Sequence, residues 1–536
     1  MKKGGTFLFP PMSLLRRRRY SGATIQRYPL LPVALALAVG IIFTPDIYVT
    51  VVVGAVFVGV AIVVPRMRRL LLTFSHIIVS VALGSVLAGY AQCSLYVPPE
   101  ITEEPITCRA VVLRTVRQHP RSTTIEIMPI TGKLRNRKVW ATLQHDTAAN
   151  TAAVTCCTFS PGTSLVLTAT FHSTVASAYE SSMPPHYMMS QQVVATTFIP
   201  HWCWRIAHYS NTEVLDKPLR IKLRLARLRH RLTHHYIRHI PDTDARALLS
   251  ALTLGDKTTL PTSLRRAYAT AGVAHVLALS GMHLGMIYMI LTLHRRYRRR
   301  HSNPVIEGVV LALLWAYIVM VGAPPSAVRA GIMLTLFSLV SLSHRESMSL
   351  NALSFSAILM MLFNPYVVYD VGFQLSILSV AGILLFCGRG DRGRYPLRWL
   401  RSMLSVSLSA QLAVFPLVAY YFSRLPLLFL PVNVLVFPLV FVILVLATSS
   451  LLLSEFLSCF QVADVSLFPL ETVEYYLWHA TGCVAEWLNG IVGMVEKIPW
   501  GVLDGIRFNE WQVVFLYIFL FLSWAVVNKC RDIFIR

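Results

Sequence analysis

Long apolar runs separated by short cationic loops dominate the sequence. An α-helix needs about 20 apolar residues to cross the hydrocarbon core of a bilayer. Runs that approach this length predict about 12 transmembrane helices, near 29–45, 47–65, 70–91, 272–293, 304–322, 325–343, 349–363, 366–387, 400–422, 427–453, 463–488 and 510–529. The pattern therefore predicts a polytopic α-helical membrane protein.

Cationic loops predict its orientation, because short loops rich in Lys and Arg stay on the cytoplasmic side. When twelve spans alternate, five such segments fall on one side: 14–20, 66–69, 294–301, 389–401 and 529–536. We therefore expect a basic cytoplasmic N-terminus over 1–28, three transmembrane helices over 29–91 and a cytoplasmic C-terminus. Residues 92–271 should lie outside the cytoplasm.

A β pattern follows the third predicted helix. Short runs rich in β-branched residues, separated by loops, lie at 107–118, 122–130, 138–144, 163–171 and 192–199. Five strands within about 100 residues are typical of a small barrel such as an OB-fold. We expect an external OB-like β domain over 92–205.

The stretch 216–240 predicts a basic amphipathic helix. Apolar residues recur every three or four positions along one stripe: Ile221, Leu225, Leu228, Leu232 and Tyr236. Cations cover the other faces, and such a helix can lie in the membrane interface. An anion arriving from outside would explain why so basic a helix is external. We assign 206–271 to this helix and linker helices, 272–453 to a transmembrane core, and 454–536 to a C-terminal transmembrane region.

The charge balance suggests an anionic partner. Only 14% of the residues are charged, yet the net charge is +24, more than orientation requires. Lipid headgroups or nucleic acid would explain the excess; the alternative is that the cations only orient the chain. For the basic first half of the β domain, the alternative to nucleic-acid contact is a solvated basic face. The external candidates for DNA binding are Arg109, Arg114, Arg117, Lys133, Arg135, Lys138, Lys222, Arg224, Arg227 and Arg231.

Cysteine and histidine spacing predicts neither a metal site nor a cofactor. The nine cysteines include no CxxC pair, and the i,i+4 pairs His230/His234 and His235/His239 lack the carboxylate of a zinc-hydrolase motif. Three cysteines share the external segment, where they could form a disulfide or remain buried thiols: Cys108, Cys156 and Cys157.

Polar residues interrupt the apolar runs at four places. "HVLALSGMHLGMIYMIL" (275–291) carries His275, Ser280, Gly281 and His283, with Gly281 permitting a helix break. In "GAPPSAVRAGIM" (322–333), two prolines stop one helix and Ser326 can begin the next, with Arg329 one turn inside. A helix N-terminus beside an arginine is suited to an anion such as phosphate.

The other two places lie further along the chain. Asp370 and Gln374 share a helix face, and Gln411 and Asn433 lie in proline-containing spans. Each position alone could simply join helices. Helix joining alone explains Arg329 and Asp370 less well, because charge within a span is rare. These two residues could pair with each other or line a pathway. Together the four clusters predict a polar path through the bundle.

At these residues the sequence resembles the ComEC-type family of competence DNA-uptake channels. The similarity runs through "ALLSALTLGDKTTLPTSLRRAYATAGVAHVLALSGMHLGM" (247–286) and resumes in "GAPPSAVRAGIM". It continues through 349–386 and 409–439, in family order, so it covers nearly all of 240–450. The early spans followed by an OB-like domain resemble the family's N-terminal region more weakly.

The resemblance implies an inner-membrane channel that admits one DNA strand to the cytoplasm during natural transformation. Its partners would be single-stranded DNA, membrane lipid, a DNA receptor outside the membrane and a separate helicase-like ATPase, because GxxxxGK[ST] is absent. No HxHxDH zinc motif occurs either, so we expect no nuclease or other enzyme activity. A separate nuclease would then degrade the other strand. A homodimer is compatible with the sequence.

Two other classes of protein fit part of the pattern. A small-molecule or ion transporter would also have broken helices and polar groups at mid-membrane, but it would not explain the external basic helix or the β domain. An intramembrane serine protease would use Ser280 with His283 or His275.

Overall fold

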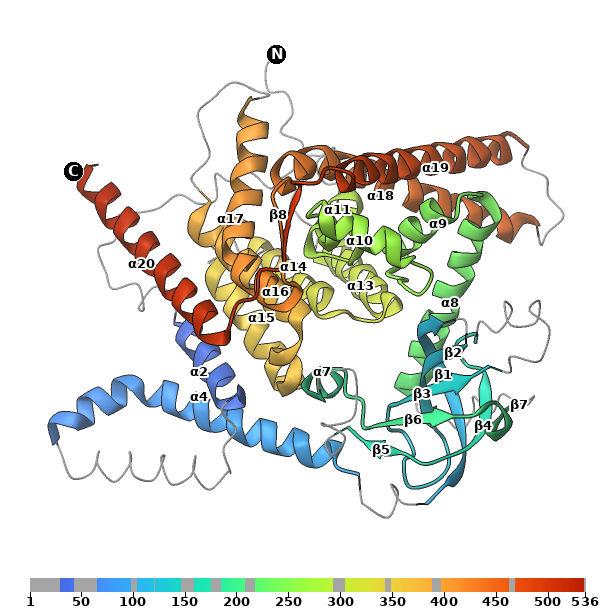
Figure 1. Cartoon of the computed structure of the whole chain (residues 1–536), viewed down its shortest axis with the longest axis horizontal. Coiled ribbons are helices and arrows are strands. Elements are labelled where there is room, and N and C mark those ends of the chain that lie inside the picture. The colour runs from blue at the N-terminus through green and yellow to red at the C-terminus, as the bar shows by residue number, and fades with distance from the viewer. Residues whose placement is uncertain are drawn as a thin grey trace.

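The computed structural model describes residues 29–42, 65–97, 104–119, 121–145, 159–174, 185–207, 217–292, 304–342, 349–387, 397–461 and 468–534. It is a mostly helical bundle with one β-sheet domain, which lies at one corner and is joined to the bundle by helix α8 (Figure 1). The predicted span at 47–65 lies almost entirely outside the described residues.

The β domain contains all five predicted strands. They are β1 (Ile106–His119), β2 (Ser122–Pro129), β3 (Val139–Gln144), β4 (Ser164–Ala169) and β6 (Ala195–Ile199), joined by the short strands β5 (His172–Ser173) and β7 (Trp204–Ala207). The strand order is β5-β6-β3-β2-β1-β4-β7. Alternate residues of β2 and β4 are fully buried, including Ile125, Ile127, Leu165 and Leu167. Within the described residues no ladder joins the outer strands β5 and β7, so a closed OB barrel stays a prediction.

Helix α8 (Lys217–His239) is the predicted basic helix, but its buried stripe differs from the expected one. Ile221 is 56% exposed, whereas Leu219 and Leu223 are buried against Val111 of β1. The stripe is displaced because this end of α8 packs on the sheet. At the other end Tyr236 is fully buried as predicted, with a 2.7 Å hydrogen bond between its hydroxyl and that of Thr253.

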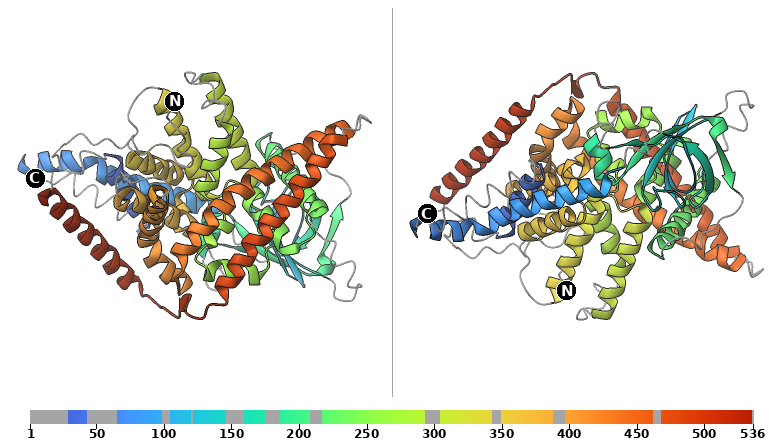
Figure 2. Two further views of the ribbon diagram at one scale, coloured as in Figure 1. Left: turned by 90° about the horizontal axis from the view of Figure 1, so that it is seen from above. Right: turned by 90° about the horizontal axis from the view of Figure 1, so that it is seen from below.

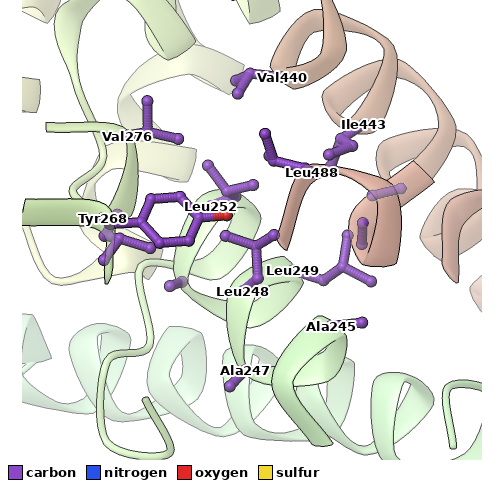
Figure 3. Close-up of a cluster of buried hydrophobic side chains, with 14 of the residues drawn as sticks. Ala245, Ala247, Leu248, Leu249, Leu252, Tyr268, Val276, Val440, Ile443 and Leu488 are labelled. Carbon is purple, nitrogen blue, oxygen red and sulfur yellow. The ribbon is translucent and has the colours of Figure 1, made fainter. Parts of the chain in front are cut away.

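The chain between α8 and the bundle consists of short helices. These are α9 (Thr243–Leu249), η5 (Ser250–Leu254), α10 (Thr262–Thr270) and η6 (Ala274–Leu277). Leu248, Leu249, Leu252 and Tyr268 pack against apolar residues of two later helices, α18 (Phe429–Gln461) and α19 (Phe468–Glu496), as Figure 3 shows. The segment expected to link two domains therefore forms part of the largest apolar core.

The remaining helices agree with most predicted spans. They are α2 (Leu30–Ile42), α4 (Pro65–Leu95), α11 (Gly281–Leu291), α13 (Pro304–Val321), α14 (Pro325–Leu342), α15 (Ser349–Phe363), α16 (Val371–Phe386), α17 (Leu397–Phe422) and α20 (Glu510–Phe534). Residues 272–293 do not form one helix, because the chain is extended between η6 and α11. Figure 2 shows α18 and α19 lying side by side along one face and α20 apart from them.

By length and composition, four described helices could cross a membrane, over His76–Leu95, Pro304–Val321, Leu400–Phe422 and Phe429–Ser458. Six further apolar helices are shorter. The chain is therefore a helical membrane protein, and the count of twelve spans stays a prediction.

Candidate functional site

The break before α11 is fixed by a reciprocal cap. The Ser280 Oγ accepts a hydrogen bond from the backbone N–H of His283 (3.4 Å), and the His283 Nδ1 accepts one from the backbone N–H of Ser280 (3.3 Å). Both side chains thus hold the start of the helix. A serine nucleophile would instead need a hydrogen bond between its hydroxyl and an imidazole nitrogen, so this geometry favours a capping role over the protease reading.

The start of α14 packs against the same break. As expected, this helix begins at the paired prolines, with Pro325 as its first residue. The Ser326 hydroxyl donates a 2.7 Å hydrogen bond to the Leu279 carbonyl oxygen in the extended segment. One polar side chain therefore joins two interrupted helices where their ends meet.

Arg329 lies one turn further into α14 and is only 5% exposed. Its Nε donates to the Ser376 Oγ of α16 (3.0 Å), and its Nη1 lies 3.6 Å from the Met333 Sδ. The Nη2 lies 3.2 Å from the position that a Cβ on Gly281 would occupy. The residues Ser280, Gly281, His283, Ser326 and Arg329 are called the α11 site below.

Arg329 and Asp370 do not pair, contrary to one of the two sequence interpretations. Among the described residues no carboxylate forms an ion pair with Arg329. Asp370 instead caps α16, since its Oδ1 accepts from the Phe373 N–H at 2.9 Å. Its Oδ2 accepts from the Gln191 Nε2 at 3.1 Å, so Asp370 joins the bundle to the β domain.

The other predicted path residues are dispersed. Gln374 donates to the Val368 carbonyl oxygen and accepts from the Tyr421 hydroxyl. His275 is exposed on η6, while Gln411 and Asn433 are half-buried on α17 and α18. No hydrogen bond found within the described ranges joins these four side chains to the α11 site.

Two polar residues of this region were missed in the sequence. Glu307 of α13 is 2% exposed and accepts hydrogen bonds from the hydroxyls of Tyr288 (2.6 Å) and Ser338. A carboxyl group within the apolar run 304–322 was a readable signal. Ser376, the partner of Arg329, gave no such signal in the sequence, because serine is ordinary in membrane helices.

Three of the external cations surround a buried carboxylate. Glu126 of β2 accepts from the Arg114 Nε at 2.7 Å and lies 3.8 Å from the Lys138 Nζ, with Lys222 of α8 also near. Burial raises the pKa of the Glu126 carboxyl, but the charges of Arg114 and Lys138 and the hydrogen bond from Arg114 lower it below its ordinary value.

The seven remaining external candidates are all exposed. Arg231 forms a two-pronged ion pair with Glu455 of α18, at 2.5 and 3.1 Å, and the Arg227 Nε donates to the Pro161 carbonyl oxygen. The other five are Arg109, Arg117, Lys133, Arg135 and Arg224, of which Lys133 also has a partner in the structure.

Of the two histidine pairs noted in the sequence, His235/His239 meets carboxylates from elsewhere in the chain. The His235 Nε2 lies 3.3 Å from Glu455, and the His239 Nε2 lies 3.7 Å from Glu474 of α19. His239 also stacks on Trp478, with 5.0 Å between the ring centroids. These contacts attach the C-terminal half of α8 to α18 and α19.

Cys108 is a buried thiol, and burial raises its pKa to about 11. Cys156 and Cys157 lie outside the described residues. The disulfide therefore stays a prediction.

Fold and site together define a helical membrane protein with a β-sheet domain and a buried cation at a broken helix. The family model described as "Competence protein" matches residues 252–529, more than half of the chain. The chain therefore belongs to the competence protein family, of the ComEC type.

Three curated relatives are similar to it. ComE operon protein 3 of Bacillus subtilis (strain 168) is 29% identical over 63% of this chain and 40% of its own length. An uncharacterized protein of Aquifex aeolicus (strain VF5) is 33% identical over 42% of this chain and 52% of its own length. The uncharacterized protein YcaI of Escherichia coli (strain K12) is 23% identical over 50% of this chain and 37% of its own length. The chain thus spans about half or less of each relative, and no solved structure matches.

Proposed function

We propose that this protein is an inner-membrane channel that passes single-stranded DNA into the cytoplasm during natural transformation. The observation that carries the proposal is the buried Arg329 at the α11 break, within the region that matches the competence family. No carboxylate in the described part of the chain pairs with it. A polyanion crossing lipid needs a polar, partly cationic route, and charges inside a membrane protein commonly mark such routes.

The external arrangement supports the same proposal. With both termini in the cytoplasm, the β domain and α8 lie outside, where DNA arrives. There the exposed cations Arg109, Arg117, Lys133, Arg135 and Arg224 would gather the strand by its phosphates, without regard to sequence. An OB-like barrel is the form we propose for this domain.

The protein is proposed to act without catalysis. The strand would be delivered by a DNA receptor outside the membrane and drawn in by a separate helicase-like ATPase. The other strand would be removed by a separate nuclease.

The test follows fluorescently labelled double-stranded DNA in a deletion strain complemented with wild-type protein, Arg329→Ala or Arg266→Ala. Arg266, exposed on α10, is the matched control. We expect DNA to stop outside the inner membrane in the deletion strain, and entry to be restored by wild type and Arg266→Ala but not by Arg329→Ala. Unchanged cytoplasmic DNA in the deletion strain would refute the channel.

A further inference from the structure

The α11 site contains hydrogen-bond donors without acceptors. At the start of α11 the backbone N–H groups of Gly281 and Met282 have no acceptor among the described residues, as is usual for the first turn of a helix. These groups form the positive end of the helix dipole. A helix start alone identifies no ligand, but two buried side chains add to it.

His283 supplies the first of these side chains. It is completely buried, and its Nε2 has no hydrogen-bond partner among the residues that the structure describes. Because its Nδ1 accepts from the Ser280 N–H, the proton of the neutral ring must be on Nε2. The Nε2–H is therefore a buried donor without an acceptor, which is costly unless an acceptor occupies the site.

Arg329 supplies the second side chain. Its guanidinium is buried and has its Nη2 beside Gly281. Within the described ranges, its side-chain partners are a serine hydroxyl and a thioether. A buried cation next to the positive end of a helix is unfavourable unless an anion compensates both. Donors alone, together with uncompensated positive charge, indicate a ligand that is anionic and rich in oxygen acceptors.

We propose that the α11 site binds one phosphate group, with Arg329 and the first N–H groups of α11 as its main donors and the Nε2–H of His283 as a supporting donor. This deepens, and for its natural ligand rests on, the proposed function: the group would be a phosphodiester of the translocating strand. A phospholipid headgroup or inorganic phosphate offers the same chemistry, so the experiment separates these sources.

The test measures the melting temperature of the purified full chain in a maltoside detergent. The additions are chloride at matched ionic strength, inorganic phosphate, phosphatidylglycerol and a short oligothymidylate. The variants are Arg329→Met, which removes the charge at similar volume, and Arg266→Met as control. We expect a phosphate-containing addition to raise the melting temperature of wild type and Arg266→Met, but not of Arg329→Met. Without ligand, Arg329→Met should melt at the wild-type temperature or above, because an uncompensated charge is gone.

Each contrary result has a distinct meaning. A lower ligand-free melting temperature in Arg329→Met with an unchanged rise on ligand addition would make Arg329 structural and overturn the phosphate site. No rise in wild type with any addition would also overturn it. A higher melting temperature with lipid or inorganic phosphate, but not with oligothymidylate, would support the phosphate site and contradict the DNA-channel proposal. If oligothymidylate raises the melting temperature of Arg329→Met as well, the protein binds DNA, but not through the α11 site.

A second variant, Gly281→Ala, tests the site if Arg329→Met does not fold. In Gly281→Ala the new methyl group would lie 3.2 Å from both the Arg329 Nη2 and the Ala330 Cβ, so it crowds the site without removing a donor. Loss of the ligand-induced rise in this variant supports the site, and a full rise contradicts it.

Discussion

Glu126 shows how one residue can hold the basic surface of the β domain together. Its buried carboxylate is the anion that Arg114 and Lys138 share. If it is neutralised, those cations face each other without compensation. Residues that look like part of a nucleic-acid surface in the sequence therefore also have a structural role.

Glu126→Gln should lower the stability of the β domain by about 2 kcal/mol, because Arg114 and Lys138 lose their shared buried carboxylate. The expected loss is below that of a fully buried pair, because these cations are 44% and 31% exposed and solvent screens them. Thermal unfolding of the full chain would measure this, with Glu104→Gln, which changes an exposed carboxyl, as the control. Equal melting temperatures for the two variants would contradict the structural role of Glu126.

The same carboxyl predicts a pH dependence. Its folded-state pKa lies below its ordinary value, and the unfolded value is about 4.3. The stabilisation is therefore fully present above about pH 4.3 and is lost as the pH falls through the folded-state pKa. The difference in stability between wild type and Glu126→Gln should therefore stay constant from neutral pH down to about pH 4.3 and decrease below it. A constant difference down to pH 3 would be inconsistent with this assignment.

At the scale of elements, the start of α11 depends on the Ser280 cap. Ser280→Ala should destabilise the protein by about 1 kcal/mol, the usual effect of losing an N-cap hydroxyl. Ser280→Thr keeps the hydroxyl and should stay close to wild type. Melting temperatures of the two variants test this, and a large loss in Ser280→Thr would show that the site needs the volume of serine rather than its hydrogen bond.

Among the exposed cations of helix α8, Arg231 is paired with a carboxylate, whereas Arg224 has no carboxylate partner within the described residues. This difference predicts unequal roles in DNA binding. Arg224→Gln should lower the slope of log affinity against log salt by about 0.7 for single-stranded DNA, the value for one lost phosphate contact. Arg231→Gln should leave the slope unchanged, because Arg231 is paired with Glu455. Fluorescence anisotropy with labelled oligothymidylate at several salt concentrations measures both slopes. If the slopes of both variants equal that of wild type, α8 is not part of the contact surface.

Sequence patterns predicted the elements whose signal is local. All five β runs, the basic helix and the break at Ser280 and Gly281 follow from β-branched runs, helical periodicity and capping chemistry. The partners of these elements depended on tertiary contacts. Asp370 binds Gln191 and Arg231 binds Glu455 across 179 and 224 positions of sequence, separations at which no local pattern records a contact. The displaced stripe of α8 has the same cause, because the sheet decides which face is covered.

At the scale of the whole molecule, α8 and α18 together place a constraint on topology. The Arg229 Nη1 of α8 donates to the Val321 carbonyl oxygen, at the end of α13 that the predicted orientation places outside. Two residues later, Arg231 pairs with Glu455 near the far end of α18. Gly272, just after α10, lies against Phe429 at the near end of α18. The external segment thus follows a helix of 33 residues, about 50 Å long.

This contact pattern conflicts with two of the predicted spans. If α18 and α19 crossed the membrane, Glu455 and Glu474 would lie on the cytoplasmic side, yet they contact Arg231 and His239 of α8. Moving the strongly cationic α8 across the bilayer would be costly. We therefore expect α18 and α19 to lie along the outer face of the membrane, although α18 is also one of the four helices long and apolar enough to cross it. Removing two crossings keeps every cationic loop on its predicted side, so loop charge could not distinguish the two arrangements.

Cysteine labelling in intact spheroplasts separates these arrangements. Single cysteines at Thr472, near the start of α19, and at Trp500, after its end, would be introduced into a variant without the nine native cysteines. A membrane-impermeant maleimide should label both positions if α19 lies on the outer face, because both then face the same compartment. A separate variant that keeps Cys530 as its single cysteine should react only after lysis. Labelling of the Trp500 position alone, with Thr472 reacting only after lysis, would mean that α19 crosses the membrane and that α8 reaches Glu455 by another route.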